Sequence, residues 1–351
     1  MDMATSFVNT KLPPFTFDHE RAEALVLKLY NDYLSRNMLY AHENASTAPQ
    51  NKHKPWRKVA IQTSLFDDVS RITTAPKIKP LSLKHFIWIF FATLTDRRQV
   101  SDEVYKAHCV IYNERPYLYS KKAIKENPEA LGEYLATKKV GVPRQSAEYW
   151  VRCAKTLFER FSGDPLKLLK HCGDNVEGVQ KFKEKTEKET GSDPLPGYGP
   201  KITSLFTLFL AELGVYQMPR DAFPVDVHVQ AIFLQQEIIV PVERDTVNDE
   251  LEDFLRKFLC EMAFKHDLDK VHLSHAFWIK GAKLCTGCSR RKAVQLLCSI
   301  ESSCLGRVDT NPYFKAGVWE FPLTFMRKGN HRKFKIENKN GDDTNHHLFE
   351  D

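Results

Sequence analysis

The sequence lacks an apolar run long enough to cross a bilayer. The longest apolar segments, Phe86 to Leu94 and Ile202 to Leu213, are too short or too interrupted by polar residues, because a membrane-spanning helix needs about 20 apolar residues. Met1 to Lys11 has neither the basic start nor the apolar stretch of a secretory signal. We therefore expect an intracellular protein with no membrane partner, in the cytoplasm or nucleoid, or in the nucleus if the source is eukaryotic.

A strong excess of one charge is also lacking. Lysine and arginine number 51 against 45 aspartates and glutamates, which gives a net charge of +6, so the total charge is only a weak indication of a nucleic-acid partner. Hydrophobic residues make up 42% of the 351 residues and charged residues 27%, which is an ordinary globular composition. The length is enough for a sizeable core and suggests two domains or one long interrupted domain.

Alternation of polar and apolar residues, which is typical of half-buried strands, is hard to find between Leu81 and Leu213. Short helical stretches follow one another instead, such as the one that places Trp150, Ala154 and Leu157 on one stripe. The breaks between the stretches fall at Arg115-Pro116, Asn127-Pro128, Gly141-Val142-Pro143, Gly163-Asp164-Pro165 and Pro194 to Pro200. We predict five or six helices of about 8 to 15 residues and an all-α fold.

Helical periodicity also occurs on both sides of this region. After the polar start Asp18 to Glu20, apolar residues repeat with a period close to 3.6 at Ala22, Leu25, Val26, Leu29 and Tyr33. We expect this N-terminal segment, residues 1–80, to pack with the C-terminal half of the chain. A second helical region is predicted from Asp226 to about His266, with an apolar face at Leu251, Phe254, Leu255, Phe258, Leu259 and Met262. Residues 327–351 are polar and charged, which predicts a disordered tail.

The stretch Leu195-Pro196-Gly197-Tyr198-Gly199-Pro200-Lys201 is the most informative one in the chain. Two glycines separated by one residue can form a tight turn that a partner approaches closely, because no Cβ intervenes. The run from Ile202 to Leu213 predicts a helix. The exposed N–H groups of Gly199 and its neighbours, at the positive end of the helix dipole, would attract a phosphate. An ordinary turn explains the same residues equally well.

Asp226 lies in Pro224-Val225-Asp226-Val227-His228-Val229, directly before an apolar helical run. An aspartate in this position caps the helix, because its carboxylate accepts hydrogen bonds from the first N–H groups. The same carboxylate could also face a neighbouring cleft. Taken alone, the structural role as a cap is the better explanation.

Together these two motifs resemble those of the helix-hairpin-helix (HhH-GPD) superfamily of DNA glycosylases, in particular its endonuclease III-like members. In that family a Leu-Pro-Gly-x-Gly-x-Lys hairpin binds the DNA backbone, and a Val-Asp-x-His motif supplies the catalytic aspartate. The resemblance implies that Gly197, Tyr198 and Gly199 bind the DNA backbone, that Lys201 is the lyase lysine, and that Asp226 is the catalytic carboxylate.

The resemblance also implies an architecture of two helical domains with the active site in the cleft between them. Residues 81–213 would form a six-helix, barrel-like bundle that contains the hairpin 195–201. Residues 214–310 would form the second domain, with the catalytic aspartate and a cysteine loop at 285–304.

Two features depart from the family. The stretch between Lys201 and Asp226 is longer by about two helical turns, with the extra residues at Val215 to Phe223, a turn-like segment. Thr93 stands where the family inserts a glutamine into the base stack, which leaves the inserted residue unassigned.

Four of the eight cysteines lie in one short window, as Cys285, Cys288, Cys298 and Cys304, with the spacing C-x2-C-x9-C-x5-C. Disulfides persist mainly outside the cytosol, so metal binding is the first explanation for such clustering. Four thiolates can hold either zinc or a four-iron cluster. The endonuclease III-like members carry a 4Fe-4S cluster at this point of the chain with the spacing C-x6-C-x2-C-x5-C. The resemblance therefore favours iron, with zinc as the alternative.

A basic run, Arg290, Arg291 and Lys292, lies between the cysteines. A solvated turn is a reasonable explanation for it. In the family the cluster loop contacts the DNA backbone, and the resemblance implies the same contact for these three residues.

The activity implied by the resemblance is base excision repair of double-stranded DNA that contains a lesion or a modified base. The base flips into a pocket, and its N-glycosidic bond is hydrolysed while Asp226 stabilises the positive charge left on the sugar. A deprotonated Lys201 attacks C1′, forms a Schiff base and nicks the strand by elimination. The protein would then be a monomeric bifunctional glycosylase and lyase.

Three alternatives remain open at this point. The first is a monofunctional glycosylase in which Lys201 only touches phosphate. The second is a non-catalytic helix-hairpin-helix DNA-binding protein with a structural zinc site, in which Asp226 is only a cap. The third is a zinc-ribbon interaction module on a helical scaffold.

Overall fold

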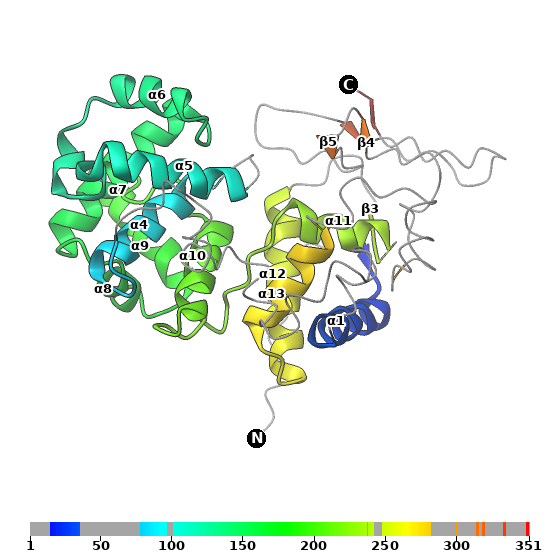
Figure 1. The fold of residues 1–351 in the computed structure, drawn as a ribbon. Helices are drawn as coiled ribbons and strands as arrows, with labels where there is room; N and C mark the ends of the chain where they lie inside the picture. Colours follow the sequence, from blue (N-terminus) through cyan, green and yellow to red (C-terminus); the bar gives the residue numbers. More distant parts are fainter. Residues whose placement is uncertain are drawn as a thin grey trace, which may run out of the picture. The chain divides into compact units, whose positions relative to one another are not determined.

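The computed structural model describes residues 15–35, 78–96, 101–236, 238–241, 248–281 and 300, together with four two-residue strands between 314 and 350. Helices predominate in the described part of the chain and its strands are short, which confirms the prediction of an all-α fold (Figure 1). Among the described residues, no helix combines the length and the apolar character that spanning a membrane requires.

The helices and strands follow one another along the chain without a repeating unit. The helices are α1 (His19–Leu34), α4 (Leu83–Leu94), α5 (Ser101–Glu114), the 3-10 helices η2 (Pro116–Tyr119) and η3 (Lys121–Lys125), α6 (Pro128–Thr137), α7 (Pro143–Arg160), α8 (Pro165–His171), α9 (Val176–Thr190), α10 (Pro200–Glu212), α11 (Val227–Gln235), α12 (Asn248–Lys265) and α13 (Lys270–Trp278). The strands are β1 (Phe15–Phe17), β3 (Ile239–Pro241), β4 (Phe314–Lys315), β5 (Val318–Trp319), β6 (Lys333–Phe334) and β7 (Phe349–Glu350).

The described residues fall into two compact units. We call the first the hairpin unit; it comprises the described residues within 50–224 and 256–275. We call the second the aspartate unit; it comprises those within 1–49, 225–255 and 276–351. Helices α12 and α13 contribute residues to both units.

Helix α4 forms the centre of the hairpin unit, and Figure 1 shows it in cyan among the green helices. Trp88, Phe90 and Phe91 are fully buried. A helix that is apolar on all sides has to be covered on all sides, and α4 contacts α5, α7, α8 and α10. The ring of Phe91 stacks on that of Trp150 in α7 with centroids 4.8 Å apart. The apolar stripe predicted for α7 therefore packs on the central helix.

Most of the breaks predicted in this unit are the starts of helices. Pro128, Pro143, Pro165 and Pro200 each lie in the first turn of a helix, where the N–H that proline lacks would have no partner within the helix. The described residues between 83 and 212 form seven α-helices rather than the five or six expected. The prediction was too low because the stretch after Pro165 holds two helices, α8 and α9, which are separated at Gly173 and Asp174, two residues with positive φ.

The aspartate unit combines helices with three pairs of short strands. The apolar stripe predicted for α1 is buried, from Ala22 to Tyr33. Strand β1 pairs with β3 in antiparallel fashion, with Phe17 opposite Ile239. The sequence predicted continuous helical character across this second segment, which was wrong, because the β-branched Ile239 and Val240 favour an extended conformation.

A buried polar cluster lies inside the hairpin unit, around His108 on α5. Its Nε2 lies 2.7 Å from the hydroxyl of Thr95, and its Nδ1 lies 2.8 Å from the hydroxyl of Tyr119. The imidazole stacks on Trp150 with centroids 5.3 Å apart and is fully buried. Both ring nitrogens therefore have partners, as a buried imidazole requires.

The buried histidines predict that the fold is sensitive to acid. Burial lowers the pKa of His108 and of His85 to about 3, whereas a histidine in an unfolded chain titrates near 6.5. Below that pH the unfolded state binds protons that the folded state excludes. We expect each histidine to lower the free energy of unfolding by up to ~1.4 kcal/mol per pH unit as the pH falls.

Urea unfolding at a series of pH values between 6.5 and about 5, above the range in which carboxylates titrate, measures this slope. In His108→Gln the contribution of this residue is lost, so the slope should be shallower than in the wild type. An equal slope in both proteins would show that His108 takes up its proton in the folded state.

Candidate functional site

The predicted hairpin is a tight turn between α9 and α10. The amide of Tyr198 donates to the carbonyl of Leu195 over 3.0 Å, so Pro196 and Gly197 occupy the two central positions. Gly197 has a φ of +93°, a conformation that residues with a Cβ rarely adopt, and Pro-Gly in these positions is typical of a type II turn. The turn itself therefore requires glycine at 197.

Tyr198 fastens the turn to the core. Its side chain is 2% exposed and stacks on the ring of Phe90 in α4, with centroids 4.5 Å apart. Its hydroxyl donates to the main-chain carbonyl of Phe90 over 2.7 Å. Burial raises the pKa of Tyr198 well above its ordinary value, so the hydroxyl keeps the proton that it donates. The sequence did not indicate this structural role for the residue between the two glycines.

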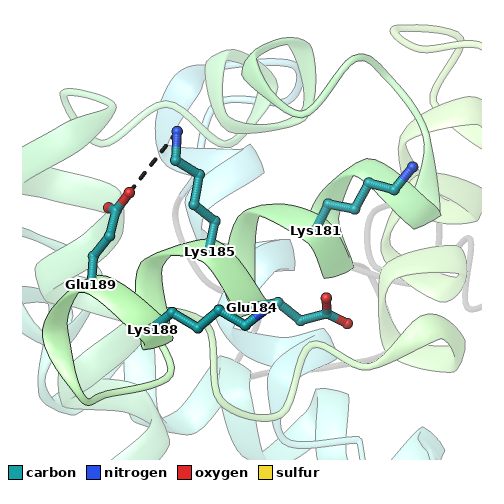
Figure 2. Close-up of a pocket in the computed structure, with 5 residues that line it drawn as sticks. All are labelled: Lys181, Glu184, Lys185, Lys188 and Glu189. Carbon is teal, nitrogen blue, oxygen red and sulfur yellow. Dashed lines mark ion pairs between the residues drawn. The ribbon is translucent and has the colours of Figure 1, made fainter.

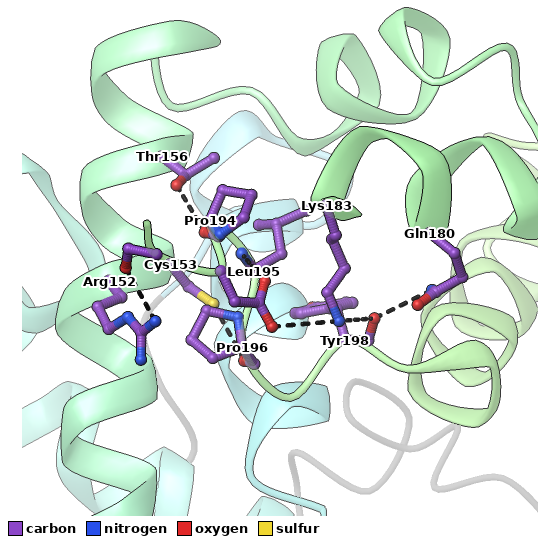
Figure 3. A network of polar contacts seen from close by, with 11 residues as sticks. Arg152, Cys153, Thr156, Gln180, Lys183, Pro194, Leu195, Pro196 and Tyr198 are labelled. Carbon is purple, nitrogen blue, oxygen red and sulfur yellow. Dashed lines mark hydrogen bonds and ion pairs between the residues drawn. The ribbon is translucent and has the colours of Figure 1, made fainter. Parts of the chain in front are cut away.

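Helix α7 holds the chain that leads into the turn, as Figure 3 shows. The hydroxyl of Thr156 donates to the carbonyl of Pro194 over 2.6 Å, and the thiol of Cys153 donates to the carbonyl of Pro196 over 3.5 Å. Both side chains are buried. Main-chain oxygens on this side of the hairpin are therefore turned toward α7.

Helix α9 holds the other side of the turn. The side chains of Gln180 and Lys183 both donate to the carbonyl of Tyr198, over 3.1 and 3.0 Å (Figure 3). Lys183 also pairs with the carboxylate of Asp193 at 3.4 Å. Side chains from α4, α7 and α9 thus converge on a segment of seven residues, 192–198.

Helix α10 begins at Pro200 with Gly199 as its N-cap. Gly199 has no side chain that could cap the helix, and the amides of Lys201 and Ile202 have no partner within it. The amide of Gly199 itself was expected to be open to a phosphate. This was wrong, because it donates to the carbonyl of Gly197 over 3.0 Å. The N–H groups left for an anion at this helix start are those of Lys201 and Ile202.

The space beside Gly199 is open. A Cβ built on this glycine would meet no heavy atom within 4 Å, and its φ of −77° is accessible to every residue type. The described residues therefore do not require glycine at 199. What the glycine provides is room for another molecule beside the N-terminus of α10.

Lys201 lies in the first turn of α10 and is half-buried. Its side chain makes no hydrogen bond or ion pair with any of the residues that the structure describes. The positive charge of a lysine interacts unfavourably with the positive end of the helix dipole. Stabilisation of α10 therefore does not explain why a lysine occupies this position.

Asp226 caps α11, as the sequence predicted. Its Oδ1 accepts from the amides of His228 and Val229, over 2.9 and 3.0 Å. The side chain is half-buried. Both hydrogen bonds use Oδ1, and Oδ2 accepts none from the described part of the chain. The cap therefore fixes the carboxylate and leaves one of its oxygens for another function.

The segment between α10 and Asp226 is irregular, as predicted, and it is anchored by Asp221. The carboxylate of Asp221 accepts from the amides of Val176 and Glu177, over 3.0 and 2.9 Å, at the start of α9. The amide of Phe223 donates to the hydroxyl of Ser204 in α10 over 3.2 Å. This loop is therefore tied to both helices that flank the hairpin.

Two cations hold the same loop through its main chain. Arg256 donates to the carbonyl of Asp221 over 2.7 Å, and the ammonium group of Lys270 donates to the carbonyls of Pro219 and Ala222. Burial lowers the pKa of Lys270. No motif in the sequence marks Asp221, Arg256 and Lys270, because their partners are distant in the chain.

A close packing contact joins Gly281 to the helix that Asp226 caps. A Cβ on Gly281 would lie 2.6 Å from the Cβ of His228 and 3.1 Å from its carbonyl oxygen. Only glycine lets the two main chains approach this closely. His228 is two residues after Asp226, so this contact helps to set the position of the cap.

Thr93, which stands where the family inserts a glutamine into the base stack, lies in the core. Thr93 is fully buried in α4, and its hydroxyl donates to the carbonyl of Ile89 over 2.7 Å. A side chain in this position cannot reach a base stack without unfolding the helix. Thr93 is therefore excluded as the inserted residue.

The predicted metal and basic residues lie outside the described residues: Cys285, Cys288, Cys298 and Cys304, with Arg290, Arg291 and Lys292. Within the described ranges, no three side chains of histidine, cysteine, aspartate or glutamate gather as a metal site would require. The described cysteines are free thiols. Burial raises the pKa of Cys109 to about 12 and that of Cys172 and Cys260 to about 11, so they stay protonated.

The outer face of α9 carries a shallow, charged depression, lined by Lys181, Glu184, Lys185, Lys188 and Glu189 (Figure 2). Lys185 pairs with Glu189 at 4.0 Å, and Lys181 pairs with Glu177 at 2.8 Å. Cations and anions alternate along this face, so it offers no uniform field for a phosphate backbone. A solvated helix surface explains it.

No model of a known protein family matches the chain, and no curated protein matches it either.

The contact between Gly281 and His228 leads to a prediction on stability. We expect Gly281→Ala to lower the free energy of unfolding by about 1–3 kcal/mol, because the main chain at His228 has to shift. The matched control is Gly199→Ala, where the new methyl group meets open space and the loss should stay below about 1 kcal/mol. Chemical denaturation of both variants measures the difference. Equal stabilities of the two variants would contradict the close contact.

Proposed function

We propose that this protein is a DNA glycosylase of the helix-hairpin-helix type, with base excision from double-stranded DNA as its activity. The observation that carries the proposal is the construction of the hairpin. Side chains of α4, α7 and α9 hold the turn 195–198. The turn lies directly before a helix start whose first amides have no partner within the helix, with open space beside its glycine cap. Such a helix start binds phosphate through its N–H groups and its dipole.

Asp226 supports the enzymatic form of the proposal. Loss of a base leaves positive charge on the sugar, and a fixed carboxylate nearby lowers the barrier by stabilising that charge. Asp226 is held by two hydrogen bonds to one of its oxygens. A carboxylate oriented in advance in this way costs little reorganisation during the reaction.

Lys201 supports the lyase step. In its neutral form the amine attacks C1′ of the damaged nucleotide as the base leaves, and the Schiff base that results allows elimination of the 3′ phosphate. The side chain of Lys201 has no partner among the described residues that would hold it in another role.

The cysteine window completes the proposal. Cys285, Cys288, Cys298 and Cys304 would hold a 4Fe-4S cluster, or zinc as the alternative, and Arg290, Arg291 and Lys292 would contact DNA phosphates. A cluster of this kind would fix the loop that carries the basic residues. Metal analysis of the purified protein distinguishes iron from zinc.

The proposal is tested first with a panel of duplexes, each of which carries one damaged or modified base. Release of a base from one or more of them is the expected result. A protein that releases no base from any duplex, while it binds them, would instead be a non-catalytic DNA-binding protein.

Replacement of Asp226 by asparagine separates catalysis from capping. Asparagine is as good a helix cap as aspartate, so α11 should stay folded. We expect excision to fall about 100-fold or more, while DNA affinity stays equal or improves because a negative charge near the phosphates is removed. Single-turnover excision and a binding titration measure the two effects.

The matched control is Asp269→Asn, because Asp269 caps α13 through the same pair of bonds, to the amides of Val271 and His272 over 2.8 and 3.0 Å. Excision should be unchanged in this variant. If Asp226→Asn retains excision within about tenfold of the wild type, the barrier has changed by less than roughly 1.4 kcal/mol and Asp226 is only a cap.

Replacement of Lys201 by glutamine tests the lyase step. We expect Lys201→Gln to lose strand nicking and covalent trapping by borohydride, because only a Schiff base is captured, while part of the DNA affinity remains. Lys185→Gln, on the outer face of α9, should trap like the wild type. Trapping that persists in Lys201→Gln would assign the nucleophile to another amine. A wild-type protein that excises but never traps is monofunctional.

A further inference from the structure

One main-chain oxygen of the hairpin, the carbonyl of Tyr198, is held by two side chains of α9. Gln180 and Lys183 donate to it over 3.1 and 3.0 Å (Figure 3). Lys183 is a charged donor, its side chain is only 14% exposed, and it also pairs with Asp193 at 3.4 Å. A hydrogen bond from a charged donor is about twice as strong as one between neutral groups. Lys183 is therefore the main restraint on this carbonyl.

The neighbouring lysines of α9 have a different environment. Lys181 and Lys185 are 71% and 79% exposed, and within the described residues each forms its ion pair with a glutamate of its own helix. Figure 2 shows both lysines among the residues that line the charged depression on α9. Of these three lysines, Lys183 is the one that donates a hydrogen bond to the turn. Lys181 and Lys185 therefore provide controls of the same residue type.

The restrained peptide group is held at its other end by one hydrogen bond, from the amide of Gly199 to the carbonyl of Gly197, and without the donors of α9 it could rotate. The carbonyl of Tyr198 and the amide of Gly199 belong to one trans peptide and point in opposite directions. Rotation of this peptide changes φ of residue 199, and glycine accepts either sign of φ at little cost. In the rotated form the carbonyl oxygen of Tyr198 would point away from α9, and its negative end would repel a phosphate.

We propose that Lys183 is a positioning residue for DNA-backbone binding by the hairpin, a role that rests on the proposed function. Its ammonium group keeps the Tyr198 carbonyl turned inward, toward α9. The N-terminus of α10 then presents amides alone to the phosphate. Lys183 itself does not contact DNA.

Affinity and its dependence on salt together test this role. The probe is a short duplex with a stable abasic-site analogue, titrated against the full-length protein at several salt concentrations. We expect Lys183→Met to bind about tenfold more weakly than the wild type at each salt concentration. The slope of log affinity against log salt should be unchanged, because the loss of a direct phosphate contact lowers it by about 0.9 and no such contact is lost.

Lys185→Met is the matched control, since it removes the same charge from the outer face of α9, and it should bind like the wild type. Thermal unfolding of each variant identifies loss of the fold. If Lys183→Met does not fold, Gln180→Leu removes the second donor to the same carbonyl without a change in charge. We expect it to weaken binding about threefold with an unchanged slope.

The remaining outcomes overturn one claim or both. If the wild type binds the duplex and Lys183→Met binds as tightly as Lys185→Met, the role of Lys183 is wrong and the proposed function stands. A slope lowered by about 0.9 in Lys183→Met would make Lys183 a direct phosphate ligand rather than a positioning residue. A wild-type protein that does not bind the duplex overturns the proposed function and the role of Lys183 together.

Discussion

Burial of α4 on all sides is the constraint on which the hairpin unit depends. Its aromatic residues face in different directions, and each of them sets the position of another part of the fold. Phe91 stacks on Trp150 and so sets the position of α7. The ring of Phe90 stacks on Tyr198, and its main-chain carbonyl accepts a hydrogen bond from the Tyr198 hydroxyl. A single apolar helix thereby positions both the scaffold and the turn. Because interiors are close-packed, a change of volume in α4 would be transmitted to the hairpin.

The two residues proposed for catalysis, Asp226 and Lys201, have opposite effects on the stability of the helices that they begin. Asp226 stabilises the helix that it caps, since a carboxylate is favourable at a helix N-terminus. Lys201 occupies the same kind of position on α10 with the opposite charge, which the dipole opposes. Fold stability alone accounts for the aspartate and does not account for the lysine. A residue that works against the local electrostatics is the more informative indication of function.

Much of the fold follows from local rules that the sequence displays. The Asp164-Pro165 pair starts α8, and the stripe around Trp150 is the buried face of α7. The type of turn at Pro196-Gly197 can also be predicted, because the two residues fix its dihedral angles. These features depend on residues a few positions apart.

The features that could not be predicted depend on residues far apart in the chain. Tyr198 and Phe90 are separated by 108 positions, and Asp221 and Val176 by 45. The β-branched residues at 239 and 240 favour a strand, but its partner, β1 at Phe15–Phe17, lies far away in the sequence. No periodicity or motif in the sequence predicts such long-range pairs, because they depend on tertiary packing. For the same reason the sequence assigned the free amide to Gly199, where the folded turn has already used it.

The way in which the hairpin is held has a consequence for its use as a module. The segment from α9 to α10 contains the whole sequence motif. It supplies only some of the contacts that hold the turn, namely the hydrogen bonds from Gln180 and Lys183. The bonds from Thr156 and Cys153 come from α7, and the acceptor for Tyr198 comes from α4. A helix-hairpin-helix cut from this chain and grafted onto another scaffold would therefore keep its sequence and lose most of its rigidity. Transfer of the motif requires transfer of the helices beneath it.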